Sequence, residues 1–191
     1  MALFPMFVDL KDQNCLVIGG GEVALRKIEQ LVKFSPKLCV IAPEIHEEIR
    51  ALAALYPIAL YERRYVRDDL SERYLVIGAL DDIEEQKKIY SACTEAKIPV
   101  NCVDSPALCS FIFPALIVEK DLCVGINTAG RAPAVSSALR KYLSALIPEA
   151  IGDLIDEVDA IRRSEPVGRP RQEKIIRKCR EFFGRIEKIK Q

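Results

Sequence analysis

The stretch that most constrains the fold lies near the N-terminus, where a short apolar run meets three glycines and a helical pattern. Residues 15–18, Cys-Leu-Val-Ile, show no alternation of apolar and polar side chains, which is typical of a strand buried on both faces of a parallel sheet. Gly19, Gly21 and Ala24 then follow the pattern G-x-G-x-x-G/A. The first glycine permits a tight turn, the second lets backbone approach a pyrophosphate, and the small third residue lets helix pack against strand. The stretch therefore predicts a strand, a phosphate loop and a helix that bind a dinucleotide.

The start of this helix and the end of the next strand complete the predicted cofactor site. Free N–H groups and the positive end of the helix dipole near Glu22 and Val23 would meet the phosphates. The second predicted strand, 37–42, is followed by Pro43 and Glu44. Glu44 could hold the ribose hydroxyls or could simply favour the start of the following helix, and both interpretations stay open. Because an acid there disfavours a 2′-phosphate, we expect NAD rather than NADP.

Two later strands end in residues suited to the same site. The apolar run 74–79 ends in Ala79, with Asp81 just beyond, and small residues there would let a cofactor ring come near the backbone. The run 98–103 is followed by Asp104. A carboxylate in a ligand crevice can be desolvated and act as a general acid or base. The alternative is an ordinary turn residue.

The late part of the chain departs from the βα rhythm. Residues 110–118 and 122–126 flank a polar turn and predict a hairpin. In the following loop, Thr128, Gly130 and Arg131 offer a hydroxyl, a backbone N–H and a guanidinium to an anion, with a plain helix cap as the alternative.

Two amphipathic helices are predicted at the C-terminal end, over 149–164 and 170–189. The first carries an apolar stripe too long for the remaining chain to cover, formed by Ile151, Leu154, Ile155, Val158 and Ile161. We therefore expect a homodimer.

Composition excludes several classes of protein. Lys plus Arg and Asp plus Glu number 28 each in 191 residues, so no overall charge favours nucleic acid or an anionic membrane. No apolar run approaches about 18 residues and the N-terminus lacks a charged n-region, so we expect no membrane span, no signal peptide and a cytoplasmic location. The seven cysteines form no C-x-x-C pair and His46, the single histidine, is expected on the surface, so no metal site is predicted.

The predicted fold class is α/β with three parts. Residues 1–113 form a Rossmann-like NAD-binding domain with a parallel sheet, 114–147 a small central αβ module, and 148–191 a helical dimerisation region.

Six short motifs, in this order and spacing, carry a resemblance to a known family. They are Phe4-Pro5 with Phe7, Gly19-Gly20-Gly21-Glu22-Val23-Ala24 with Arg26-Lys27, Val40 with Ala42-Pro43, Asn101 with Val103-Asp104, Ser110-Phe111-Ile112 with Pro114-Ala115, and Thr128 with Gly130 and Pro133. On these residues the chain resembles the precorrin-2 dehydrogenase family, also called the siroheme synthase N-terminal module. Some members of that family are also sirohydrochlorin ferrochelatases.

The resemblance implies NAD-dependent oxidation of the tetrapyrrole precorrin-2 to sirohydrochlorin. Glu22-Val23 and Pro43-Glu44 match positions that contact NAD in the family. Asp104 matches the carboxylate assigned as general base, which is also implicated in inserting Fe²⁺ in bifunctional members. The substrate carries eight carboxylates, which Arg131 and the Thr128–Gly130 backbone would help to hold.

The chain departs from the family pattern in two places. Ala132 stands where a serine is common in the family, so one hydroxyl is missing from the late loop. The sequence also has no segment for the methyltransferase domain of some relatives, and we do not expect a third activity.

Other functions remain open. Iron insertion into sirohydrochlorin is neither indicated nor excluded by a metal-binding motif. The chain could also be a non-catalytic NAD-sensing module, or a tetrapyrrole-carrying protein without turnover.

Overall fold

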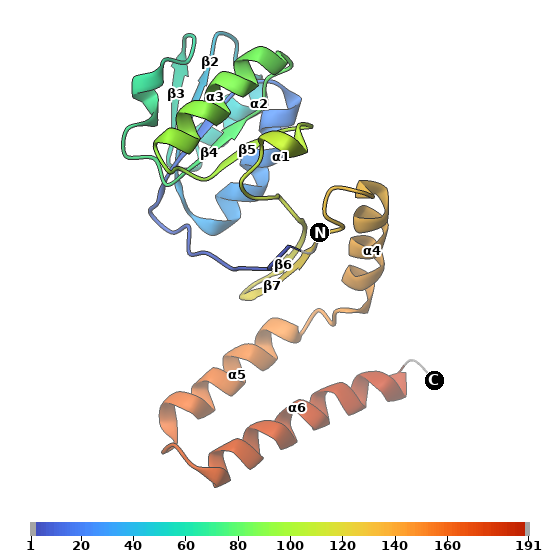
Figure 1. Ribbon diagram of the computed structural model, residues 1–191. Helices are drawn as coiled ribbons and strands as arrows, with labels where there is room; N and C mark the ends of the chain where they lie inside the picture. The colour runs from blue at the N-terminus through green and yellow to red at the C-terminus, as the bar shows by residue number, and fades with distance from the viewer. Residues whose placement is uncertain (1–2, 190–191) are drawn as a thin grey trace. The chain divides into compact units, whose positions relative to one another are not determined.

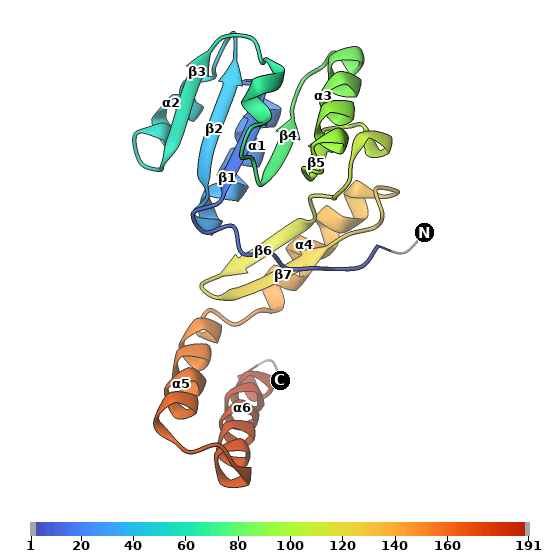
Figure 2. The ribbon, with the colours of Figure 1, turned by 60° about the vertical axis from the view of Figure 1, so that its left-hand side comes forward.

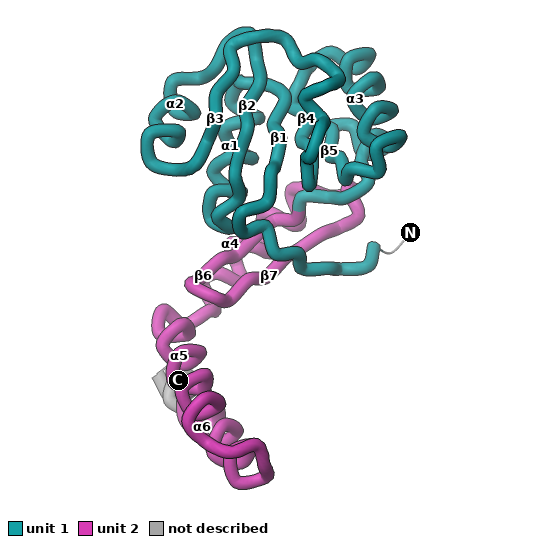
Figure 3. The backbone as a smooth tube through the Cα atoms, turned by 90° about the vertical axis from the view of Figure 1, so that its left-hand side faces the viewer, with its two compact units in different colours: residues 1–113 teal, residues 114–191 magenta. Residues whose placement is uncertain are grey.

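The computed structural model describes the backbone of residues 3–189 and the side chains of residues 3–184. The chain divides into two compact units, Met1–Phe113 and Pro114–Gln191 (Figure 3). The first predicted boundary lies at the same point, whereas the second, after residue 147, falls inside the second unit.

The first unit is built on a five-stranded parallel sheet (Figure 1). Its strands are β1 Asn14–Ile18, β2 Lys37–Ala42, β3 Ile58–Glu62, β4 Leu75–Gly78 and β5 Val100–Cys102. They lie in the order β3-β2-β1-β4-β5, so the chain builds outward from β1 in both directions. This order is the Rossmann-like topology, and it confirms the predicted parallel sheet.

Helices cover both faces of this sheet, which explains the unbroken apolar runs of its strands. On one face, α1 (Glu22–Leu31) and α2 (Glu47–Ala53) pack against side chains that include Val17 and Val40. On the other, α3 (Ile83–Glu95) packs against a cluster that includes Leu16. Each fully buried aliphatic side chain contributes about 1.5–3 kcal/mol relative to exposure, so these two layers supply most of the unit's stability.

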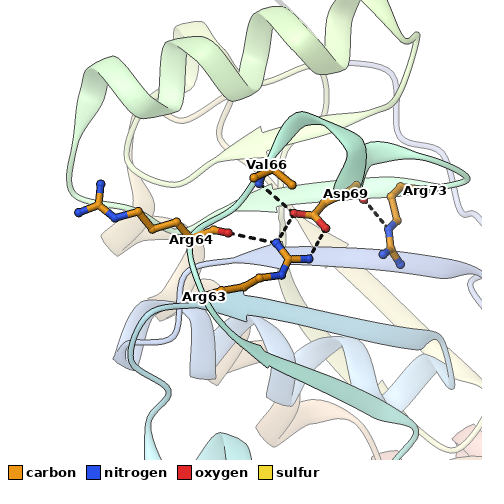
Figure 4. A network of polar contacts seen from close by, with 5 residues as sticks. All are labelled: Arg63, Arg64, Val66, Asp69 and Arg73. Atoms are coloured by element: carbon orange, nitrogen blue, oxygen red, sulfur yellow. Dashed lines mark hydrogen bonds and ion pairs between the residues drawn. The ribbon is translucent and has the colours of Figure 1, made fainter.

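The crossover from β3 to β4 is held by a polar network around Asp69 (Figure 4). Both oxygens of the Asp69 carboxylate accept hydrogen bonds from the Arg63 guanidinium, at 2.6 and 2.8 Å, and one also accepts from the Val66 N–H at 2.9 Å. Arg73 Nε donates to the Asp69 carbonyl oxygen at 2.8 Å. The hydrogen bonds from Arg63 are the main reason that the pKa of Asp69 lies below its usual value.

The second unit begins with an antiparallel hairpin, β6 (Ala115–Glu119) and β7 (Leu122–Ile126), against which α4 (Pro133–Leu146) packs (Figure 2). Two further helices, α5 (Ile151–Ser164) and α6 (Arg169–Ile189), pack against each other. No helix of the described residues is long and apolar enough to cross a bilayer.

The hairpin starts later than predicted. The strand expected over 110–118 begins only at Ala115, because Ser110 belongs to the first unit. Its Oγ accepts a hydrogen bond from the Val100 N–H at 2.8 Å, and its own N–H donates to the Val100 carbonyl at 2.8 Å. Residues just before Pro114 therefore run along β5.

Candidate functional site

The candidate site lies at the carboxyl edge of the five-stranded sheet, where four strands end level with one another. Ile18 is in register with Ile41 and with Gly78, and Gly78 with Cys102. The order of the strands reverses between β1 and β4, and open α/β sheets bind ligands at such a switch point. The loops after β1 and β4 therefore flank the expected ligand crevice.

The three glycines of the first loop have different surroundings. Gly19 has φ +119°, and a Cβ there would lie 2.1 Å from the Ala79 carbonyl oxygen. A Cβ on Gly20 would lie 2.1 Å from the Glu44 carbonyl oxygen. A Cβ on Gly21 would meet nothing within 4 Å. At the first two positions, the absence of a side chain allows the neighbouring loops to approach the backbone. At the third, the absence of a side chain leaves open space beside the backbone.

The N-terminus of α1 provides donors for an anion in that space. Gly21 is the N-cap and supplies no side-chain cap, and the first hydrogen bond of the helix runs from the Leu25 N–H to the Gly21 carbonyl at 3.0 Å. Among the described residues, no acceptor is bonded to the N–H groups of Glu22, Val23 or Ala24. Ala24 is fully buried, so the helix packs close to the sheet as its small side chain predicts. Free amides, the helix dipole and open space fit a pyrophosphate.

Pro43 and Glu44 lie beside the glycine loop. The Gly20 carbonyl accepts a hydrogen bond from the His46 N–H at 2.8 Å, which fixes the turn after β2 against the loop after β1. Glu44 is exposed and precedes α2 by three residues, whereas His46 is the residue that caps α2, its Nδ1 accepting from the Glu48 N–H at 3.2 Å. His46 was expected on the surface, and the structure adds that it is half-buried there as the cap of α2.

The loop after β4 brings Ala79 and Asp81 to the same edge. Ala79 donates its N–H to the Ile18 carbonyl at 2.8 Å, which places it directly beside Gly19. Asp81 is exposed, and its neighbour Asp82 caps α3 by accepting from the N–H groups of the first turn.

Gln86 connects this loop to the end of β5, a role that the sequence analysis missed. Its side chain is buried in α3, and Nε2 donates to the carbonyls of Leu80 at 2.5 Å and Val103 at 3.2 Å. A polar residue at the buried spacing of α3, three before Ile89, was the available signal.

Asp104 follows β5 in a strained turn. Its φ is +60°, in the left-handed region that Asp tolerates better than most residues, and the Ser105 N–H donates to the Cys102 carbonyl at 3.2 Å. Asp104 is exposed, so the predicted desolvation of its carboxyl group is not observed. Neighbouring strands are about 4.8 Å apart, so Asp104 follows a strand about 10 Å from β1.

Lys27 is a second functional candidate that the sequence analysis left outside the site. It is partly buried on α1, and its Nζ lies 4.6 Å from the centroid of the Phe113 ring. Burial lowers the pKa of Lys27, while the nearby Asp104 carboxylate opposes that shift. The motif contained Lys27, but only the fold brings it near Asp104.

The remaining predicted residues lie in the second unit. The Thr128 Oγ1 accepts from the Ala132 N–H at 3.2 Å and shares a hydrogen bond with the buried Ser136 hydroxyl at 3.1 Å. Its hydroxyl thus closes the loop before α4, but it does not cap the helix, whose N-cap is Ala132 and has no side-chain cap. Gly130 and Arg131 are exposed. The described residues contain no group of three or more His, Cys, Asp or Glu side chains that could hold a metal ion.

Comparison with known proteins agrees with the geometry of the first unit. The chain belongs to the family described as "Putative NAD(P)-binding", whose family model matches residues 6–115. The dinucleotide-binding prediction is thereby confirmed.

The similar proteins include siroheme synthases. One from Thioalkalivibrio sulfidiphilus is 40% identical over 162 residues, which cover 85% of this chain and 33% of that protein. One from Nitrosomonas europaea is 36% identical over 184 residues, which cover 96% of this chain and 38% of that protein. The chain thus spans about a third of the length of these relatives, and the resemblance drawn from the six motifs is confirmed.

A solved structure shows the same fold. "SirC, precorrin-2 dehydrogenase" matches with a TM-score of 0.73 at 22% identity, and the match covers 97% of this chain and 100% of that one. The α/β fold with a helical C-terminal region is therefore confirmed.

Proposed function

We propose that the protein catalyses the NAD-dependent oxidation of precorrin-2 to sirohydrochlorin. The observation that carries the proposal is the arrangement at one sheet edge of a glycine loop with open space at Gly21 and an exposed carboxylate at Asp104. The siroheme synthase relatives and the fold of a precorrin-2 dehydrogenase support the choice of substrate.

The chemistry divides between the cofactor and this chain. Oxidation of precorrin-2 removes one hydride and one proton, and bound NAD would supply the hydride acceptor. The amides of Glu22 and Val23 bind the pyrophosphate, and Gly21 lets it approach. Asp104, which is exposed directly after β5, takes the proton.

The preference for NAD over NADP rests on Glu44. Its backbone is held against Gly20, at the end of β2 where the adenosine ribose binds in this fold. A carboxylate there repels a 2′-phosphate. Pro43, Ala79 and Asp81 complete the proposed cofactor contacts.

We assign the substrate carboxylates in part to the second unit. Gly130 and Arg131 are exposed beside the N-terminus of α4, where a guanidinium and backbone N–H groups can bind carboxylates. Thr128 shapes this loop through its bonds to Ala132 and Ser136 rather than offering a free hydroxyl.

The stripe predicted on α5 is largely covered in this chain, since Leu154 is buried and Ile151, Ile155, Val158 and Ile161 are half-buried. A homodimer is supported instead by an apolar stripe on α4. Val135, Leu139, Tyr142 and Leu146 recur at helical spacing and are 41–64% exposed. A second copy of the chain is the partner we propose, since a contiguous apolar helix face of this kind is otherwise left in water.

All seven cysteines are free, which suits the reducing cytoplasm.

The experiment is anaerobic incubation with enzymatically generated precorrin-2, followed by absorbance. NAD-dependent formation of sirohydrochlorin supports the proposal. Binding of NAD without conversion indicates the sensor, and binding of sirohydrochlorin without conversion indicates the carrier.

The same preparation tests iron insertion. In that reaction Asp104 would receive the pyrrole N–H protons, with Fe²⁺ as substrate. Insertion no faster than the uncatalysed rate removes this second activity.

A further inference from the structure

The ammonium group of Lys27 is partly buried without a carboxylate partner. Among the described residues it forms no ion pair, whereas its neighbour Arg26 pairs with Glu22 at 3.3 Å. Its Nζ lies over the Phe113 ring, and such a contact offers no hydrogen-bond acceptor to the three N–H donors. Removing a cation from water is costly unless an anion compensates, so this position gains from an anionic ligand.

The neighbourhood of Lys27 is the turn that carries the proposed base. The Cys109 thiol donates to the carbonyls of Cys102, at 3.1 Å, and Ser105, at 3.3 Å, which lie on either side of Asp104. Burial raises the pKa of Cys109, so the thiol stays protonated and keeps donating. Asn101 reinforces this arrangement, with Nδ2 donating to the Phe111 carbonyl at 2.9 Å. Segment 109–113 is thus held along β5 and places Phe113 under Lys27.

The cofactor phosphates are a poorer match for Lys27 than the substrate. Lys27 lies five residues after Glu22, which is about 7 Å along the helix from the free amides at a rise of about 1.5 Å per residue. Its side chain lies against Phe113 and near Asp104, on the β5 side, rather than at the helix N-terminus. Lys27 and Asp104 therefore lie near each other without forming an ion pair among the described residues.

We propose that Lys27 binds a carboxylate side chain of the tetrapyrrole and so orients the macrocycle with its proton-losing position toward Asp104. This inference rests on the proposed function and adds a substrate-positioning residue to it. The contact is charge-assisted, and its partner, one of the acidic side chains on the macrocycle rim, stays bound through the reaction.

The test compares three variants of the full chain. Lys27→Gln removes the charge, Lys27→Arg keeps it, and Lys33→Gln removes the charge of an exposed lysine just after α1 as a matched control. For each, we measure the Kd for sirohydrochlorin by absorbance titration, the KM and kcat for precorrin-2, and the Kd for NAD.

We expect Lys27→Gln to raise the sirohydrochlorin Kd and the precorrin-2 KM about 10-fold or more, the loss typical of one charge-assisted bond. Lys27→Arg should stay within about 3-fold of the wild type, Lys33→Gln should match it, and the NAD Kd should change less than about 2-fold. A merely structural role would not be rescued by arginine. If Lys27→Gln does not fold, Lys27→Met is tested in its place, because methionine keeps an aliphatic stem over Phe113.

Unchanged KM and Kd in Lys27→Gln overturn the inference while leaving the proposed function intact, and so does a selective loss of NAD binding. A wild type that binds sirohydrochlorin through Lys27 but does not oxidise precorrin-2 overturns the proposed function alone. A wild type that neither binds nor converts a tetrapyrrole overturns both.

Discussion

Replacing Gly21 with valine separates the ligand-binding role of the glycine loop from its role in folding. The backbone at Gly21 is extended, with φ −87° and ψ −169°, a conformation that valine readily adopts. A Cβ there meets no protein atom within 4 Å. Losing glycine at an N-cap costs up to about 1 kcal/mol, and the stiffer unfolded chain offsets about 0.4–1 kcal/mol. The free energy of unfolding should therefore change by less than about 1 kcal/mol.

The effect of Gly21→Val on NAD should be large. The valine methyl groups occupy the open space through which the pyrophosphate reaches the amides of Glu22 and Val23. Two charge-assisted hydrogen bonds of about 1.5–3 kcal/mol each are lost, which corresponds to at least about 100-fold in Kd. Calorimetric titration with NAD and chemical unfolding of the same sample measure both quantities.

Gly19→Ala is the contrasting variant. It combines φ +119° with a Cβ 2.1 Å from the Ala79 carbonyl oxygen, so it should lower the free energy of unfolding by more than about 2 kcal/mol. Wild-type NAD affinity in a folded Gly21→Val protein would refute the assignment of the phosphate site.

Three further predictions concern other parts of the chain. Asp104→Asn, which tolerates the left-handed backbone, should keep NAD affinity and lower kcat about 100-fold or more; normal turnover would remove Asp104 from the mechanism. Because Arg63 lowers the folded-state pKa of Asp69, its stabilisation is complete above the unfolded pKa of about 4 and is lost as pH falls through the folded value. Urea unfolding should thus show a deficit for Asp69→Asn at pH 7 that shrinks at pH 3, and a constant deficit would contradict the ionic explanation. Leu139→Glu should yield monomers by light scattering, while Ser137→Glu, exposed on the opposite side of α4, should not. Dimers in both variants would contradict the assignment of the dimer interface to this face of α4.

The fold was predictable where local pattern and burial coincide. The runs at 15–18 and 38–42 are apolar throughout because α1, α2 and α3 cover both faces of the sheet. The sequence of each strand therefore predicts that the strand is buried on both faces. The glycine loop was predictable for a similar reason, since φ +119° at Gly19 admits no other residue without strain.

The rest of the site depends on contacts between distant segments. Lys27 lies over Phe113 only because the residues after β5 fold back along that strand, and the sequence pattern around Ser110 and Phe113 did not predict this. The sequence predicted that the Thr128 hydroxyl binds an anion or caps a helix, whereas in the structure it bonds to Ala132 and Ser136 and caps no helix. A pattern shows which chemistry a residue offers, and the fold decides which partner uses it.

The most direct test of the central claim is the stoichiometry of an anaerobic turnover. Precorrin-2 is supplied with NAD, with NADP or with neither, and the absorbance of sirohydrochlorin and of the reduced nicotinamide is followed together. We predict one NADH formed per sirohydrochlorin, a much slower reaction with NADP, and none without cofactor. Sirohydrochlorin formation that is independent of the nicotinamide, or bound NAD without any conversion, would contradict the account.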